Sequence, residues 1–240
     1  MDVRGERECR DCGERWSYYE TGEIRCPACG SVRSRGVGDR AFHTDAAPEL
    51  DLEEARTRAA TSDANSDEDL RAAARLARDA AREYLAGKGF VVGGELRPLG
   101  SEYRRAAELR YVADEVERRL DVSEETVERF LTLLNDGDVA SPPESLRGAH
   151  GLAAAETADE YAGEIREWLE RAALTIDPKP ALGRLREHVK RVEALDGEVD
   201  PNEAETLVAA ARDIGRACRE DDAATLAAAE SALDTVAPSG

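Results

Sequence analysis

The sequence predicts a mainly α-helical protein that begins with a small cysteine-bearing β module. Four of its five cysteines fall between residues 9 and 29. Glycines and a proline then mark a break at residues 36 to 48, as expected of a polar connector. Beyond that break, apolar residues recur every three or four positions, which is the period of an amphipathic helix. The chain is therefore expected to form a short module followed by a helical body.

The cysteine pattern predicts a metal site. Two C-x2-C pairs, separated by 13 residues, are formed by Cys9, Cys12, Cys26 and Cys29. Two residues between cysteines let one tight turn direct both thiolates at a single ion, and two such turns supply a tetrahedral set of four sulfurs. Gly13 and Gly30 follow the pairs and can adopt the positive φ that closes each turn. We expect two zinc knuckles that hold one structural Zn²⁺.

The segment between the knuckles predicts a short β-hairpin. Residues 15 to 20 (RWSYYE) are aromatic and strand-prone, Thr21 and Gly22 offer a turn, and residues 23 to 25 lead to the second knuckle. A module of roughly 40 residues buries too little surface to fold alone. A structural zinc contributes about 10 to 16 kcal/mol in such sites, so we expect the ion to supply most of the stability.

These residues resemble a known family. The segments CRDCG and TGEIRCPACGSV are similar to the zinc ribbon of the general transcription factor TFIIB over about 30 residues. The resemblance implies a structural zinc on the four cysteines and a role linked to transcription or nucleic acid. Residues 45 to 240 show no paired cyclin-like repeats, so promoter binding is not implied. The whole chain is also similar to an uncharacterised zinc-ribbon protein family of halophilic archaea.

Iron is the alternative metal. The paired knuckles also resemble the rubredoxin-like tail of rubrerythrins, and four thiolates suit either ion. Rubrerythrins join that tail to a di-iron bundle whose helices carry Glu-x-x-His. Here the residues three positions before the histidines are Arg40, Arg147 and Leu185. The di-iron half is therefore absent, zinc is preferred, and rubredoxin-like electron transfer stays an alternative function.

The chain is predicted to divide into a zinc ribbon at residues 1–40, a linker at 41–65 with a possible short helix, and an acidic α-helical bundle at 66–240. Apolar stripes predict helices over about 66–87, 101–120, 127–134, 158–172, 180–196, 201–218 and 226–236. Ser66 and Ser101 are expected to cap the first two of these helices. A further helix is predicted near residues 50 to 60, where the apolar pattern is less regular. We expect six to eight helices in antiparallel hairpins, with Ala allowing close approach.

Two features between these helices bear on function. The glycine-rich residues 88 to 100 match no phosphate-binding motif, so they predict an ordered loop or short hairpin. Cys218 lies on the apolar stripe of its helix, which favours a core residue over a nucleophile paired with His150 or His188. We therefore expect no enzymatic activity and no small-molecule substrate.

Charge restricts the partners. The net charge is −19, and the 33 basic residues include only three lysines. Such a surface is typical of proteins in multimolar salt, where hydrated carboxylates keep the chain soluble; an acidic mesophilic protein is the alternative. Residues 1 to 44 are neutral, with eight arginines and eight acids. The chain has no membrane-length apolar run and begins with charged residues, so we expect no membrane partner and a cytoplasmic location.

The ribbon carries the candidate binding surface, in which cations alternate with rings that can stack on bases. Its members are Arg10, Arg15, Trp16, Tyr18, Tyr19, Arg25 and Arg33. Four phosphate contacts would lose about 10⁴ in affinity between physiological and multimolar salt, whereas hydrophobic contacts survive salt. We therefore expect a non-enzymatic protein–protein adaptor or regulator linked to transcription or RNA metabolism, with nucleic-acid binding as the alternative.

Overall fold

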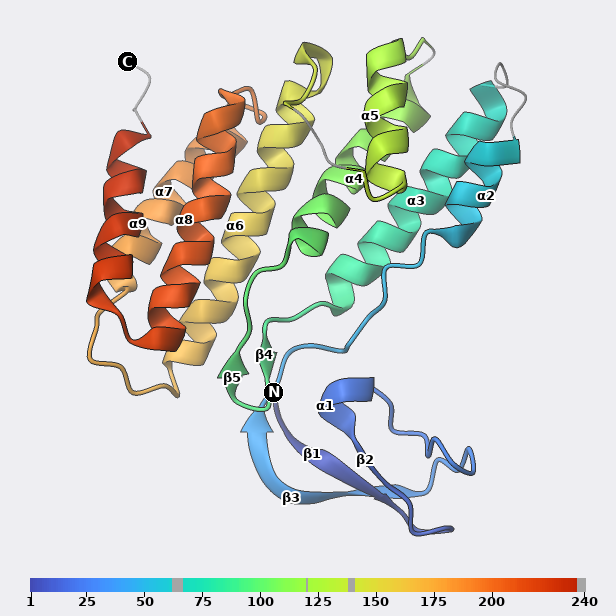
Figure 1. Ribbon diagram of the computed structural model, residues 1–240, viewed down its shortest axis with the longest axis vertical. Helices are drawn as coiled ribbons and strands as arrows, with labels where there is room; N and C mark the ends of the chain where they lie inside the picture. The colour runs from blue at the N-terminus through green and yellow to red at the C-terminus, as the bar shows by residue number, and fades with distance from the viewer. Residues whose placement is uncertain (62–66, 120, 138–140, 237–240) are drawn as a thin grey trace.

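The protein is mainly helical, and its β structure is confined to the ribbon and one short hairpin (Figure 1). The computed structural model describes residues 1–61, 67–119, 121–137 and 141–236. Eight helices of nine residues or more lie within these ranges. Their bounds are α2 Glu53–Thr61, α3 Asp67–Gly87, α4 Ser101–Arg118, α5 Glu124–Leu134, α6 Arg147–Leu169, α7 Lys179–Ala194, α8 Pro201–Glu220 and α9 Ala223–Thr235. The predicted fold class is confirmed.

Local sequence explains several helix boundaries. The carboxylates of Asp200 and Asp222 accept backbone hydrogen bonds at the starts of α8 and α9, and Ser123 caps α5 in the same way. Ser101 was expected to cap α4, but it is the first helical residue, and the capping position is Gly100 with no side-chain bond. The expected cap at residue 66 lies outside the described residues.

The helices form a row in the spatial order α9, α8, α6, α4, α3, α2 (Figure 1). Helix α7 packs on the α6, α8 and α9 side, and α5 packs on α4 and α2. Two buried apolar clusters result. The first cluster is formed by α6, α7, α8 and α9 together with the ends of α3 and α4. The second cluster is formed by α2, α3, α4 and α5. Helices α3 and α4 contribute to both clusters, so they connect the two helical groups.

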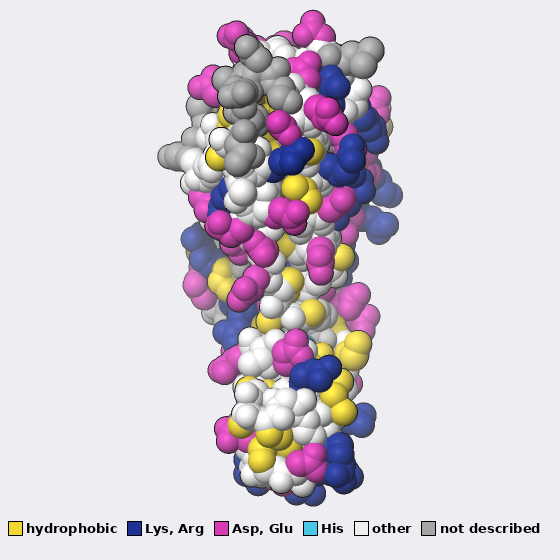
Figure 2. Space-filling view, turned by 90° about the vertical axis from the view of Figure 1, so that its right-hand side faces the viewer, with side chains coloured by type: hydrophobic (Ala, Val, Ile, Leu, Met, Phe, Trp, Pro, Cys, Tyr) yellow, Lys and Arg dark blue, Asp and Glu magenta, His cyan; other side chains and the backbone are white. Residues whose placement is uncertain are grey.

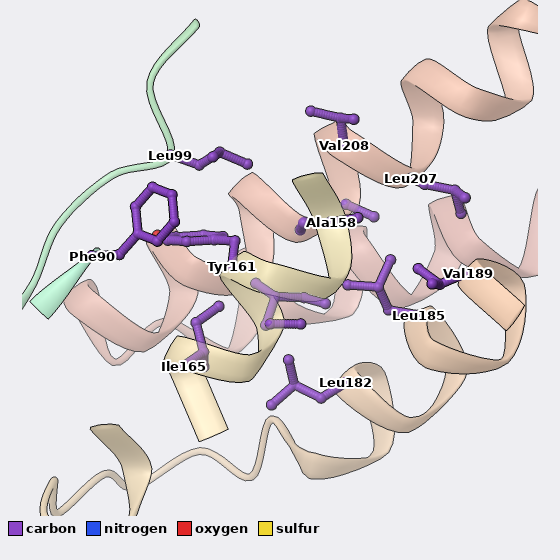
Figure 3. Close-up of a cluster of buried hydrophobic side chains, with 14 of the residues drawn as sticks. Phe90, Leu99, Ala158, Tyr161, Ile165, Leu182, Leu185, Val189, Leu207 and Val208 are labelled. Carbon is purple, nitrogen blue, oxygen red and sulfur yellow. The ribbon is translucent and has the colours of Figure 1, made fainter. Parts of the chain in front are cut away.

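The first cluster centres on Tyr161 of α6 (Figure 3). Its hydroxyl donates to the carbonyl of Arg97 at 2.9 Å and accepts from Arg219 at 2.8 Å. The ring of Phe90 meets the Tyr161 ring edge to face, with centroids 4.8 Å apart. Gly215 of α8 lies against the same ring, so this glycine lets α8 approach α6 closely.

The glycine-rich segment forms the expected short hairpin, with strands β4 Val91–Val92 and β5 Glu95–Leu96. Gly93 and Gly94 make its turn with φ of 61° and 88°, a region that glycine enters without strain. The hairpin connects the ribbon to the helices. Gly94 donates to the carbonyl of Phe42 at 2.7 Å, and Trp168 of α6 donates to the carbonyl of Gly94 at 2.9 Å.

The strands of the ribbon differ from the expected hairpin between the knuckles. The sheet has the order β2-β1-β3, with β1 Asp2–Cys9, β2 Arg15–Ser17 and β3 Ser34–Phe42, all antiparallel. Residues 18–21 form the short helix α1, and residues 23–25 form no strand. A β-hairpin is therefore present, but its strands are β1 and β2 rather than two strands between the knuckles. The placement differs because β1 also pairs with β3, so that these long strands satisfy each other's backbone groups.

Residues 36–42 form part of β3, where composition predicted a polar connector. Asp2 pairs with Phe42 at the far end of the ladder, and the Phe42 side chain is buried with the first helical cluster. The connector prediction was wrong at these residues because pairing with β1 holds the segment extended. The division into ribbon, linker and helical domain stays a prediction.

Candidate metal centre

The four predicted cysteines converge on one point at the tip of the ribbon. The sulfurs of Cys9, Cys12, Cys26 and Cys29 all lie within 4.8 Å of one another. The Cys9 and Cys29 sulfurs are 3.7 Å apart, and those of Cys12 and Cys26 are 3.6 Å apart. A tetrahedral ion with metal–sulfur bonds of about 2.3 Å places neighbouring sulfurs about 3.8 Å apart. The cluster therefore has the dimensions needed to hold a metal ion.

Each knuckle is a tight turn closed by its glycine, as expected. Gly13 donates to the Cys9 carbonyl at 3.1 Å, and Gly30 donates to the Cys26 carbonyl at 2.9 Å. The φ angles of these glycines are 79° and 71°. A side chain at either residue would be strained, because left-handed backbone disfavours a Cβ.

Backbone groups in the first knuckle favour a thiolate. The N–H groups of Cys12 and Asp11 point at the Cys9 sulfur and lower the pKa of that thiol to about 7. The Glu14 N–H likewise favours the Cys12 thiolate, but the neighbouring Cys29 thiol and burial outweigh it and raise the pKa of Cys12. Four thiols this close cannot all ionise without a cation, so a bound metal would supply the missing charge.

Trp16 packs against the cysteine cluster and is not available to bind a ligand. Its side chain is 7% exposed and packs with the two buried cysteines, Cys9 and Cys26. The indole N–H donates to the Glu23 carbonyl at 2.8 Å, which ties the segment between the knuckles to β2. Trp16 is therefore placed where it cannot stack on a base.

The other residues of the candidate surface are dispersed. Arg15 forms an ion pair with Glu8 at 2.7 Å, and Arg33 forms one with Asp11 at 2.9 Å. Arg10 and Arg25 are exposed, with no carboxylate bound in the described part of the chain. Neither lines the hollow that contains Tyr18.

Tyr18 and Tyr19 pack against His43 instead. The Tyr19 hydroxyl donates to the Val3 carbonyl at 3.0 Å, and both tyrosine rings lie against His43, at 5.8 and 4.7 Å between centroids. His43 is buried, and burial lowers its pKa. This aromatic cluster helps to fix the ribbon on the β4–β5 hairpin, because Gly93 also lies against Tyr19.

The ribbon has a groove that sequence reasoning did not identify. It has a volume of about 320 Å³, and we call it the ribbon groove. The residues that line it are Asp2, Val3, Arg4, Arg7, Tyr18, Ile24, Gly36 and Arg40. Arg4 and Arg40 are directly opposite on β1 and β3, a position in which like charges repel. Because Arg4 and Arg40 are 36 residues apart in the chain, no local sequence pattern predicts this pairing.

The groove combines cations with apolar surface. Ile24 is 53% exposed, and Val32 on the other side of the second knuckle is 61% exposed. Arg7 donates to the Ser34 hydroxyl and Arg4 to the Gly38 carbonyl. Among the described residues, none of the three groove arginines forms an ion pair with a carboxylate. The groove therefore offers three arginines without a carboxylate partner next to the exposed side chain of Ile24.

Cys218 stands apart from the metal centre. It is 1% exposed in the first helical cluster, and burial raises the pKa of its thiol to about 11. A protonated and buried thiol is a poor nucleophile. This placement agrees with the core role that its position on an apolar stripe predicted.

The fold and the cluster define a mainly helical protein with an N-terminal four-cysteine module able to hold a metal ion. The chain belongs to the DUF7117 family, a family of unknown function, whose model matches residues 1–233. That match covers the cysteine module and the helices together. No curated protein and no solved structure matches the chain. None of the described helices is both long and apolar enough to cross a membrane.

Proposed function

We propose that the protein is a cytoplasmic, non-enzymatic zinc-ribbon protein that acts as an adaptor or regulator by docking a partner protein in the ribbon groove. The observation that carries this proposal is the cross-strand pair Arg4 and Arg40, which places two cations side by side beside exposed Ile24. A partner segment that combines acidic and aliphatic residues would relieve the repulsion and cover the apolar surface.

The placement of the aromatic residues favours a protein partner over nucleic acid. Stacking on bases needs exposed rings, but Trp16 is buried and the Tyr19 hydroxyl donates a hydrogen bond to the Val3 carbonyl. Two of the predicted phosphate-binding arginines, Arg15 and Arg33, already pair with acids of the ribbon. The similarity of the knuckles to the TFIIB ribbon directs the search for the partner toward transcription and RNA metabolism.

A binding experiment with matched variants tests the groove. The metal-loaded chain is used to capture partners from its host at the salt concentration of the host cytosol, and each captured protein is purified and titrated against it. We expect Arg40→Glu to weaken the reconstituted complex at least tenfold, because it reverses charge in the groove. The control is Arg10→Glu, which makes the same charge change at another exposed ribbon arginine outside the groove and should leave the affinity within about twofold.

Equal affinities for the two variants would contradict the groove proposal. Titration of random RNA and DNA provides the competing outcome. Saturable binding of either, with a logarithmic salt slope that Arg10→Glu and Arg40→Glu both reduce, would replace the protein partner with nucleic acid.

The identity of the metal is tested separately. Four thiolates bind zinc or iron, so we propose one structural Zn²⁺ and test it by elemental analysis and a visible spectrum of protein purified from its own host. One zinc per chain without colour is the expected result. One iron per chain with thiolate charge-transfer bands would favour the electron-transfer alternative.

A further inference from the structure

A hollow in the helical body lies where the two helical groups meet. It is an open cavity of about 640 Å³ with walls from α4, α5, α6 and α8. Small-molecule sites in proteins typically have volumes of about 300 to 1,000 Å³ and often lie between structural units. We call it the inter-group cavity. Because it is more than 60 residues from the cysteines in sequence and on other elements, it is independent of the metal centre.

The cavity is rich in positive charge, although the chain has a net charge of −19. Its described lining includes four arginines and one histidine against three carboxylates. These residues are Arg104, Arg105, Arg129, Arg212, His150, Glu108, Asp136 and Glu205. The first turns of α4 and α8 also face it through Ser101 and Asn202, and helix N-termini favour anions.

Part of this charge is compensated inside the wall. Glu108 is 5% exposed, receives the Arg129 Nε–H at 2.8 Å, and lies 3.1 Å from Arg104 Nη1. His150 Nε2 is 3.2 Å from Glu205, which also accepts from Arg104 at 3.0 Å. Such a buried network is expected to be structural, because a lone buried carboxylate would be costly. It accounts for Arg129, for His150 and for both terminal nitrogens of Arg104.

Other donors in the cavity wall remain unsatisfied. The buried Nε atoms of Arg104 and Arg105 have no hydrogen-bond acceptor among the described residues. Arg212 uses its Nε to reach the Leu99 carbonyl at 3.3 Å, and its terminal nitrogens have no acceptor in the described ranges. Buried donors are normally paired, with protein or with a bound group. Arg212 therefore offers its terminal N–H groups to the cavity, and two buried Nε–H groups in the same wall lack an acceptor.

We propose that the inter-group cavity binds a small molecule through a phosphate or carboxylate group held by Arg105 and Arg212. The planar guanidinium forms two parallel bonds to either oxyanion. The cavity is larger than one such group, so the remainder of the ligand occupies the space along α5 and α8. This inference does not rest on the proposed function of the ribbon, and it departs from the sequence-based expectation of no small-molecule ligand.

Calorimetric titration of the metal-loaded full chain tests the proposal, with inorganic phosphate and succinate as probes in chloride buffer of constant ionic strength. We expect one saturable site with a Kd of about 1 mM or tighter for at least one probe. Preference for phosphate would identify a phosphorylated ligand, and preference for succinate would identify a carboxylate. Each result supports the proposal and distinguishes the source of the oxyanion.

Three variants locate the site. Arg105→Gln and Arg212→Gln should each weaken binding about tenfold, the effect of one charge-assisted hydrogen bond. The control is Arg110→Gln on the same helix. Arg110 and Arg105 have side-chain exposures of 22% and 23%, and both are ion-paired, Arg110 with Glu156 and Arg105 with Asp136 and Glu102, but Arg110 is outside the cavity lining. We expect this control to bind like the unchanged protein.

A measurement on the unchanged chain covers the case in which a variant fails to fold. Phenylglyoxal modifies accessible arginines, and the bound probe should protect Arg105 and Arg212 but not Arg110, as read by peptide mass mapping. The proposal is overturned if neither probe binds saturably, or if binding and protection are the same at Arg105, Arg212 and Arg110.

Discussion

Cys26 contributes more to the ribbon than one metal bond. It is 2% exposed and packs with Trp16 and Cys9, so its sulfur joins the metal site to the small ribbon core. Cys26→Ser should lower the metal content from one ion per chain to near zero, because a serine hydroxyl is a poor ligand for a thiolate site. Elemental analysis measures the change.

Cys218→Ser is the matched control for Cys26→Ser, because Cys218 is also buried but lies outside the cluster. It should keep the full metal content and lower the free energy of unfolding by about 1 to 3 kcal/mol through a buried hydroxyl. Full metal content in Cys26→Ser would contradict the assignment of this cysteine as a ligand.

His150 gives the helical body a pH dependence. Burial opposes its charge, but hydrogen bonds to Glu108 and Glu205 outweigh burial and raise the pKa of His150. A raised pKa stabilises the fold below the unfolded value of about 6.5, and that contribution is lost as pH rises through the higher folded value. The free energy of unfolding should therefore fall above about pH 6.5, and His150→Gln should remove that fall in urea titrations from pH 5 to 9.

The carboxylates of Glu108 and Glu205 give stability the opposite dependence on pH. Burial disfavours the charge of Glu108, but His150, Arg104 and Arg129 outweigh it and lower the pKa to about 2. The hydrogen bond from His150 is the main cause that lowers the pKa of Glu205 to about 2. Their contribution is present above about pH 4.5 and is lost as pH falls toward 2. If the alkaline fall persisted in His150→Gln, another group would be responsible for it.

At the scale of elements, close packing of α6 and α8 depends on Gly215. A Cβ built there would lie 2.2 Å from the Tyr161 hydroxyl, and Tyr161 is held by two hydrogen bonds. Gly215→Ala should therefore lower the free energy of unfolding by about 1 to 3 kcal/mol, as overpacking does. Urea denaturation followed by circular dichroism measures this change.

Gly183 provides the comparison, because it lies inside α7 and a Cβ added to it would have no atom within 4 Å among the described residues. The same substitution there should raise the free energy of unfolding by about 0.5 to 1 kcal/mol, since alanine restricts the unfolded chain. Equal effects at the two glycines would show that backbone propensity, and not contact with Tyr161, determines the outcome.

Elements with a local signal were predictable from the sequence. The cysteine spacing located the cluster, the 3.6-residue period located the long helices, and the glycine-rich residues 88 to 100 predicted an ordered loop or short hairpin where β4 and β5 lie. Strands β1 and β3 carry alternating charges, and their pairing joins Asp2 to Phe42, a long-range contact without a local signal. Tertiary pairing therefore prevailed over the turn propensity of residues 36 to 48.

The inter-group cavity was hidden for a related reason. Its charged residues come from four helices, and each alone is typical of a solvated helix face. One signal was present: Arg104 and Glu108 are four residues apart and interrupt the apolar stripe of α4, where both prove to be buried. Charged residues at core positions indicate a buried network, but only the fold shows which partners complete it.

At the scale of the whole molecule, metal removal should unfold the tip of the ribbon and leave the helices folded. The ion contributes about 10 to 16 kcal/mol to a small structural site, whereas the helices have two apolar clusters of their own. After chelation, amides of residues 9 to 33 should exchange rapidly, and those of α6 and α8 should keep their protection, as measured by hydrogen exchange with mass spectrometry. Loss of protection in α6 and α8 would show that the ion also stabilises the helical body.

The acidic surface predicts salt-dependent stability. Figure 2 shows acidic and basic side chains interleaved over one face, but the whole chain carries 52 acids against 33 bases. Raising KCl from about 0.1 to about 1 M shortens the screening length from about 10 to about 3 Å. The thermal midpoint should therefore rise with KCl but less with sucrose, which does not screen charge. A midpoint independent of KCl would contradict adaptation to high salt.

The sharing of α3 and α4 between two clusters determines how the chain can be divided. Tyr103 and Ala106 of α4 are buried in the first cluster, while Leu109 and Val112 of the same helix are buried in the second. A fragment that ends between α5 and α6 would expose Tyr103 and Ala106 to water, and the complementary fragment would lack the wall that they form. Neither half is therefore expected to be soluble by itself, and proteolytic mapping of the helical body should release no stable half.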